Sequence, residues 1–206
     1  MCAACRDPLD HPTRGAVCDA CWRAAVPIAP LECDALPPCI TRATAIGPYE
    51  GRLRDVIHAL KYDPRPTLAK HLAARMRDAA AGVLAGADLV VPVPLHRSRE
   101  RSRGFNQARE LARHLGLPMA DVLVRTRRTD TQADLPADRR HANVRGAFER
   151  ARGRGAAATL GIVVLVDDVR TTGATLNACA AVLLDAGAAE VRALTAAKAI
   201  VRTSGA

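Results

Sequence analysis

The sequence predicts an α/β protein: a mostly parallel sheet with helices on both faces, preceded by a small metal-binding segment. Two short apolar runs, 89–94 and 162–166, are each followed by polar residues and then by an amphipathic helical pattern. A repeated pair of cysteines marks the N-terminus. The 206 residues are enough for one such domain and a small appendage.

The N-terminal cysteines form two CxxC pairs, Cys2 with Cys5 and Cys18 with Cys21. Each pair can close on one metal ion, and four thiolates give the tetrahedral set of a structural zinc ribbon. A segment this short has little core, so the metal supplies stability on the order of 10 kcal/mol. The alternatives are a redox CxxC and an iron–sulfur cluster. Redox pairs usually open a helix in a thioredoxin-like context, which we do not find here, and cluster motifs have other spacings.

The next segment, 26–39, is rich in proline and is predicted to be a linker. We therefore expect a zinc ribbon with its linker in residues 1–40 and the α/β domain in residues 41–206. Cys33 and Cys39 lack a CxxC partner and are interpreted as ordinary thiols, and Cys179 as a core residue.

Two amphipathic helices precede the first buried strand. Apolar residues at helical spacing predict one helix around 53–60 and a second that runs from Leu68 to Val83 and ends near Gly86. The strand at 89–94 leads into an arginine-rich stretch that we interpret as a loop, before a helix that starts near Ala108. Closely spaced arginines repel one another unless they are solvated or share an anion such as pyrophosphate. The candidate residues of this loop are His96, Arg97, Arg99, Arg101 and Arg103.

The second buried strand, 162–166, is the most informative segment. It is followed by Asp167 and Asp168 and then by a Thr/Gly-rich loop that opens a helix. The apolar stripe of this helix ends with Leu183 and Leu184, and Gly187 closes it. Backbone N–H groups at a helix N-terminus favour a phosphate, whereas adjacent carboxylates suit ribose hydroxyls. A phosphorylated ribose satisfies both. The loop residues are Arg170, Thr171, Thr172, Gly173, Ala174 and Thr175.

Composition adds weaker constraints. The net charge of +9, mostly from arginine, favours polyanionic partners, although it can also reflect an Arg- and Ala-rich proteome. Aromatic residues make up only 2% of the chain, which argues against a single-strand binder built mainly on base stacking. We find neither a signal peptide nor an apolar run long enough to cross a membrane, so we expect a cytoplasmic protein without membrane insertion.

The segment around Asp167 and Asp168 resembles the phosphoribosyl pyrophosphate (PRPP) signature of type I phosphoribosyltransferases. The resemblance implies their fold, with Asp167 and Asp168 as the catalytic-site residues that hold the ribose 2′- and 3′-hydroxyls. It also implies that residues 170–175 bind the 5′-phosphate, that the arginines after residue 96 lie near the pyrophosphate, and that Mg²⁺ accompanies PRPP.

Two blocks, VPVPLHRSRERSRGFNQARELA and VLVDDVRTTGATL, together with the cysteine pairs, sharpen the resemblance. They are similar to the ComF family, phosphoribosyltransferase-like proteins linked to competence and DNA uptake. By position, residues 125–148 correspond to the flexible loop that closes over PRPP in active transferases. The candidate residues of that loop are Arg139, Arg140 and Arg145.

Several functions stay open at this point. The chain is a phosphoribosyltransferase or a non-catalytic module, because no residue stands out as a general base or as the reader of an acceptor. The non-catalytic alternative binds PRPP as a signal, or grips the backbone of single-stranded DNA delivered by a competence helicase. A third and weaker reading makes the zinc ribbon the nucleic-acid contact.

Overall fold

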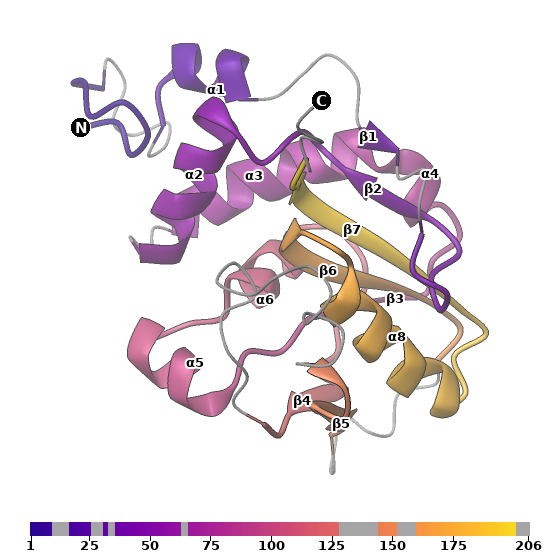
Figure 1. The fold of residues 1–206 in the computed structure, drawn as a ribbon. Helices are drawn as coiled ribbons and strands as arrows, with labels where there is room; N and C mark the ends of the chain where they lie inside the picture. The colour runs from indigo at the N-terminus through magenta and orange to yellow at the C-terminus, as the bar shows by residue number, and fades with distance from the viewer. Residues whose placement is uncertain are drawn as a thin grey trace, which may run out of the picture.

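The computed structural model describes residues 1–9, 17–25, 31–32, 36–62, 66–127, 144–151 and 160–200 (Figure 1). The helices are α1 Asp19–Ala25, α2 Gly51–Tyr62, α3 Pro66–Ala79, α4 Ala81–Leu84, α5 Arg97–Arg103, α6 Gln107–Ala112 and α8 Ala174–Asp185. The strands are β1 Leu31–Glu32, β2 Ala43–Ala45, β3 Leu89–Pro92, β4 Leu123–Arg125, β5 Phe148–Arg150, β6 Ile162–Arg170 and β7 Glu190–Lys198.

The main sheet has the strand order β1-β2-β7-β6-β3. Strands β2, β7, β6 and β3 are parallel, and β1 joins the edge antiparallel to β2. Strands β4 and β5 form a separate antiparallel pair. Residues 128–143, which the structure does not describe, lie between them in the sequence. The predicted mostly parallel sheet is confirmed.

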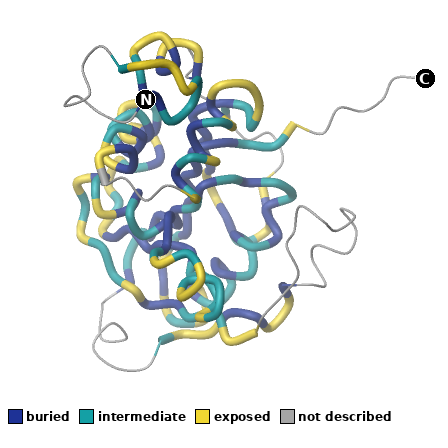
Figure 2. Tube along the Cα trace, turned by 90° about the vertical axis from the view of Figure 1, so that its left-hand side faces the viewer, coloured by how far each residue is buried: buried dark blue, intermediate teal, exposed yellow. Residues whose placement is uncertain are grey.

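Side-chain alternation along β6 divides the interior into two cores. Val164 and Val166 lie in the core formed with α2, α3 and α6. Val163 and Leu165 lie in the core formed with α8 and the β4–β5 pair. Helices therefore cover both faces of the sheet, as the continuous apolar runs predict, and buried residues fill the middle of the molecule (Figure 2).

The cysteine-bearing segment packs directly on the domain. Trp22 of α1 is 5% exposed and belongs to the core of α2 and α3. Its ring meets His71 edge-on at 6.4 Å, and the Arg75 guanidinium lies 4.9 Å from the ring centroid. The N-terminal segment is thus anchored by apolar and cation–π contacts to the helices behind it.

Three local predictions need correction. The arginine-rich stretch is not a loop but helix α5, because the His96 side chain caps the N–H of Ser98 and Gly104 ends the helix in a left-handed conformation. The helix predicted from Leu68 to Val83 breaks after Ala79. Leu184, predicted on the apolar stripe of α8, is 37% exposed.

Strand β6 also continues beyond the predicted end at Val166. It pairs with β7 as far as Arg170, and only residues 171–173 form the turn before α8. The reason is the length of β7. This strand extends to Lys198 and pairs with β6 from Ile162 through Asp167 to Arg170. As a result, Asp167 and Asp168 stand on a rigid strand rather than on a loop.

Candidate phosphoribosyl site and metal centre

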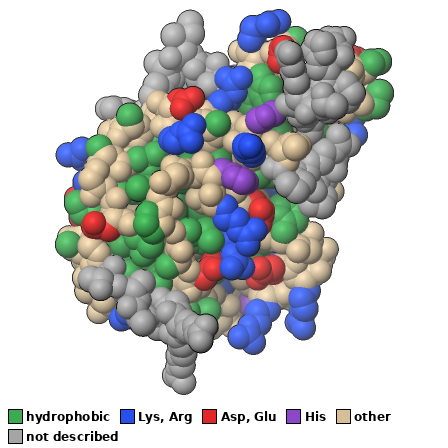
Figure 3. Space-filling model, turned by 180° about the vertical axis from the view of Figure 1, so that it is seen from behind, with side chains coloured by type: hydrophobic (Ala, Val, Ile, Leu, Met, Phe, Trp, Pro, Cys, Tyr) green, Lys and Arg blue, Asp and Glu red, His purple; other side chains and the backbone are tan. Residues whose placement is uncertain are grey.

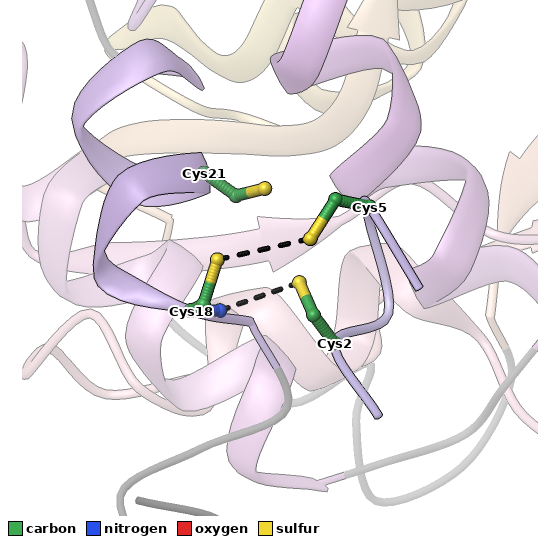
Figure 4. Close-up of side chains that lie close together, drawn as sticks. All are labelled: Cys2, Cys5, Cys18 and Cys21. Carbon is green, nitrogen blue, oxygen red and sulfur yellow. Dashed lines mark hydrogen bonds between the residues drawn. The ribbon is translucent and has the colours of Figure 1, made fainter. Parts of the chain in front are cut away.

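The four N-terminal cysteines converge on one point (Figure 4). The sulfurs of Cys2, Cys5, Cys18 and Cys21 all lie within 4.8 Å of one another, and the Sγ atoms of Cys5 and Cys18 are 3.9 Å apart. Tetrahedral zinc with metal–sulfur bonds of about 2.3 Å separates its sulfurs by about 3.8 Å. The spacing therefore fits a four-thiolate metal site.

Backbone donors favour the thiolate form of Cys2, whereas burial and the neighbouring cysteines raise the pKa of Cys21. Burial by itself raises the pKa of Cys2, but N–H groups of Cys5, Cys18 and Ala4 point at its sulfur and lower the pKa to about 6. The second pair does open helix α1, so the sequence argument against a redox CxxC does not hold by itself. The convergence of all four sulfurs is what favours a metal site over a redox pair.

The two aspartates leave β6 toward different surroundings. Asp168 is 5% exposed, and its Oδ2 lies 3.0 Å from Nζ of Lys61, the next-to-last residue of α2. Asp167 is half-buried, and its Oδ1 accepts a hydrogen bond of 2.9 Å from the backbone N–H of Asp168. Because side chains alternate along a strand, the carboxylates flank the strand end instead of lying side by side.

The two carboxyl groups of the site differ in their charge partners. Asp168 forms an ion pair with Lys61, whereas no ion pair is found for Asp167 among the described residues. Burial alone disfavours the Lys61 ammonium, but the Asp168 carboxylate more than offsets this effect and raises the pKa of Lys61. Burial, together with the adjacent Asp168 charge, raises the pKa of Asp167 from 3.8 to about 8. The site thus holds one ion pair and one carboxyl group that retains its proton easily.

The turn before α8 contains a glycine against which another segment of the chain packs closely. Gly173 has φ of +80°, and a Cβ added to it would lie 2.7 Å from Cγ of Pro37. The Thr172 hydroxyl accepts a hydrogen bond of 3.3 Å from the N–H of Ala174 in the first turn of the helix. The first N–H groups of an α-helix have no partner within the helix itself, which is the usual basis of anion binding at a helix N-terminus.

The predicted linker contributes to this turn. Pro37 packs against Gly173, and the Cys39 N–H donates to Oδ1 of Asn177 in α8 at 3.0 Å. Cys179, predicted to be core, is fully buried. Cys33 lies outside the described residues.

Helix α5 distributes the predicted pyrophosphate arginines over two sides. Arg97 and Arg101 are exposed, whereas Arg99 and Arg103 are half-buried, as the spacing of four residues dictates. His96 pairs with Arg125 of β4 as an isolated bridge. Arg170, predicted in the phosphate loop, is the buried last residue of β6.

The predicted flexible loop is only partly described. Arg139 and Arg140 lie outside the described residues. Arg145 is exposed, and its carbonyl accepts a hydrogen bond of 3.4 Å from the Arg127 guanidinium. The predicted loop begins in strand β4 and ends in strand β5, and these two strands pair with each other.

Comparisons with known proteins identify the family of the chain. Residues 101–204 match the family described as phosphoribosyl transferase domain. Competence protein F of Haemophilus influenzae is 33% identical over 165 residues, which cover 75% of this chain and 72% of that protein. DNA utilization protein YhgH of Salmonella typhimurium is 33% identical over 220 residues, with 93% and 94% covered.

The chain belongs to the ComF family. This assignment confirms the predicted resemblance and the type I phosphoribosyltransferase fold. Among solved structures, orotate phosphoribosyltransferase from Aeropyrum pernix is 19% identical with a TM-score of 0.39, over 86% of this chain and 89% of that one. In the described part of this ComF-family chain, no helix is long and apolar enough to cross a bilayer.

Three residues that lie beside the candidate site were not predicted as site residues. Lys61 and Pro37 come from segments read only as a helix and a linker. Arg125 of β4 is electrostatically coupled to both Asp167 and Arg99; burial, and then the Arg99 charge, lower its pKa. Only the fold brings these side chains to the carboxyl end of the sheet, so no local sequence pattern reports them.

The raised pKa of Asp167 predicts how stability changes with pH. The folded protein holds this proton up to about pH 8, whereas the unfolded chain releases it near 3.8, so the stabilisation is complete below 3.8 and is lost as pH rises through 8. We expect the urea midpoint to fall between about pH 5 and about pH 8, and Asp167→Asn to reduce that fall. The matched control is Asp185→Asn on the exposed end of α8. Equal falls in both variants would contradict the assignment.

Proposed function

We propose that the chain binds PRPP, or a related ribose 5-phosphate ligand, at the carboxyl end of β6. The observation that carries the proposal is the arrangement of an acidic pair on the strand end directly before the turn and N-terminus of α8. Carboxylates and a helix N-terminus are complementary to the two halves of one ligand, ribose hydroxyls and a phosphate.

The phosphate half uses the backbone of residues 171–175. Gly173 has φ of +80°, a conformation that glycine adopts readily, so the turn can present its backbone N–H groups to a phosphate, and Thr171, Thr172 and Thr175 lie in the same stretch. The α8 dipole and the N–H groups of its first turn stabilise the negative charge. Nε of Arg170 lies beside Gly173, so the positive charge of its guanidinium adds to this field.

The sugar half uses the two carboxyl groups from either side of the strand end. Asp168 is charged and ion-paired, so it accepts a hydrogen bond from a hydroxyl. Asp167, with its raised pKa, can accept as a carboxylate or donate as an acid. We propose that the ribose lies across the end of β6, between Lys61 on one side and Arg125 on the other.

The pyrophosphate group of PRPP is proposed to bind near helix α5 and strand β4. Arg99 and Arg125 are close enough for the Arg99 charge to lower the pKa of Arg125, and such mutual repulsion is relieved when two guanidinium groups share one anion. His96, Arg97, Arg101 and Arg103 supply further positive charge at the same helix. Residues 139, 140 and 145 are proposed to close over this side.

Magnesium fits the proposal only if oxygen atoms of the bound PRPP supply part of its coordination. Apart from the cysteine cluster, the described residues contain no group of three metal-binding side chains, and a lysine already neutralises Asp168. Mg²⁺ commonly binds through one or two carboxylates plus substrate phosphates. Bound in this way, it would neutralise charge on the leaving pyrophosphate, with Asp167 as the available carboxyl group.

A second candidate function is single-stranded DNA handling in transformation, in cooperation with a competence helicase. The relatives are named for competence and for DNA utilization, and the chain has a net charge of +9. On the face seen in Figure 3, basic side chains are interspersed with acidic ones, so the excess charge is not a uniform patch there. DNA binding through phosphates should collapse with rising salt, whereas PRPP binding should respond to magnesium.

We further propose that the four cysteines bind structural zinc and that residues 1–40 form this zinc segment, with residues 41–206 as the phosphoribosyl domain. The support is the convergence of the four sulfurs within 4.8 Å of one another and the burial of Cys2 and Cys21. Thiolate sites of this kind suit a reducing compartment, so we place the protein in the cytoplasm.

Isothermal calorimetry with PRPP tests the main proposal. We expect the protein to bind PRPP, more tightly with Mg²⁺, and the double variant Asp167→Asn/Asp168→Asn to bind about 100-fold more weakly. The reason is that each hydrogen bond to a charged group contributes about 1.5–3 kcal/mol. The single variant Asp167→Asn keeps the ion pair of Asp168 and should show an intermediate loss.

The matched control removes two acidic charges elsewhere, with Asp78→Asn and Asp185→Asn on exposed positions of α3 and α8. It should bind PRPP as the wild type does. Unchanged affinity in the Asp167/Asp168 variant, with its fold intact by circular dichroism, would exclude this pair as the ribose site.

Zinc content tests the metal proposal. We expect one zinc per chain by atomic absorption, and Cys18→Ser should lose the metal and lower the melting temperature, because α1 loses the ligands that hold it on α2 and α3. Cys39→Ser, a half-exposed thiol outside the cluster, is the control and should retain zinc. A metal-free wild type with unchanged stability in a chelator would disprove a structural zinc.

A further inference from the structure

Tyr62 is an unusually placed aromatic side chain. It is 69% exposed, more than any other large hydrophobic side chain in the described part of the chain. The other four aromatic residues are buried or half-buried: Trp22, Tyr49, Phe105 and Phe148. In a protein with so few aromatics, one ring is thus left for solvent at the end of α2.

Two other side chains hold this ring in place. His58, one helical turn earlier, lies 4.6 Å from it, centroid to centroid, with the planes tilted by 42°. The Arg103 guanidinium lies over the ring at 5.7 Å from its centroid. Arg103 is itself fixed, because it donates a hydrogen bond of 2.6 Å to Oε1 of Gln107.

The ring stands beside the proposed ribose site. Lys61, the preceding residue, reaches inward to Asp168, while Tyr62 remains outside. Arg103 belongs to the arginine helix α5, assigned above to the pyrophosphate side. The exposed ring therefore lies at the rim of the site, between the acidic pair and α5.

We propose that Tyr62 and Arg103 form a stacking site for a nucleobase. Aromatic rings and guanidinium planes are the two side-chain surfaces on which unpaired bases stack, and both occur here together. The separation of 5.7 Å is looser than direct stacking, so a base could displace or part the two groups. The base belongs either to a single-stranded nucleic acid or to a free nucleoside, and the chemistry of recognition is the same.

Tyr62 is not among the residues proposed to bind PRPP, whereas Arg103 belongs to the helix assigned to the pyrophosphate, so variants of Tyr62 separate the two proposals. It also qualifies the sequence-based argument against stacking. A low aromatic content excludes an extended row of stacked bases, but not one base held at one exposed ring.

Fluorescence anisotropy with two labelled oligonucleotides tests the proposal. One is oligothymidylate, and the other has the same length and phosphates but abasic sugars. We expect the wild type to bind oligothymidylate more tightly, Tyr62→Ala to weaken that binding about 10-fold, and Tyr62→Phe to preserve it because the ring remains. Binding of the abasic strand should not change in either variant.

A pair of arginine variants separates stacking from charge. Arg103→Ala and Arg113→Ala each remove one positive charge, but Arg113 lies exposed on α6 beside Glu110. Only Arg103→Ala should reduce the preference for oligothymidylate over the abasic strand.

Calorimetry with thymidine and adenosine identifies the source of the base. Binding of a free nucleoside that is lost in Tyr62→Ala assigns the site to a small ligand, and binding of the oligonucleotide alone assigns it to nucleic acid. The proposal is overturned if Tyr62→Ala binds both oligothymidylate and the nucleosides as the wild type does, or if the wild type binds no nucleoside and binds oligothymidylate no better than the abasic strand. PRPP titration of Tyr62→Ala should be unchanged, so a failure here stands apart from a failure of the PRPP proposal.

Discussion

The ion pair between Lys61 and Asp168 is the contact on which the candidate site depends. A carboxylate as buried as Asp168 is costly without a partner, and removal of one member of such a pair typically costs about 3–5 kcal/mol. The pair fastens the end of α2 to the end of β6. The Lys61 ammonium also lies 5.8 Å from the ring centroid of Tyr49, and the next residue of α2, Tyr62, remains exposed. One interaction thus organises both sides of the site.

The N-terminal segment supports this arrangement from a distance. Cys2, Cys21 and Trp22 share a core with α2 and α3, so a metal that holds the four thiolates also holds the surface against which α2 packs. At the other end of the same segment, Pro37 packs on Gly173 and fixes the turn before α8. The predicted zinc ribbon and its linker therefore contact the elements on both sides of the candidate site. They contact α2 on one side and the turn before α8 on the other.

Residues with a local signature could be predicted from sequence, and residues placed by tertiary structure could not. The buried strands, the apolar face of α2 and the cysteine pairs each follow from spacing along the chain. The extension of β6 to Arg170 depends on pairing with β7, and α5 depends on capping by His96 and Gly104 at its two ends. Lys61, Arg125 and Pro37 join the site only because three separate segments meet at one edge of the sheet. The acidic pair and the turn before α8 could be predicted together because they are neighbours in the sequence.

The most direct measurement compares ribose 5-phosphate with 2-deoxyribose 5-phosphate by calorimetry on the wild-type protein. The two ligands share the phosphate and differ in one hydroxyl, so the comparison isolates the role of the acidic pair from that of the α8 turn. Because a hydrogen bond to a charged group contributes about 1.5–3 kcal/mol, we expect the deoxy ligand to bind at least about 10-fold more weakly. Equal affinities would show that the phosphate turn binds alone and that Asp167 and Asp168 do not hold the 2′-hydroxyl.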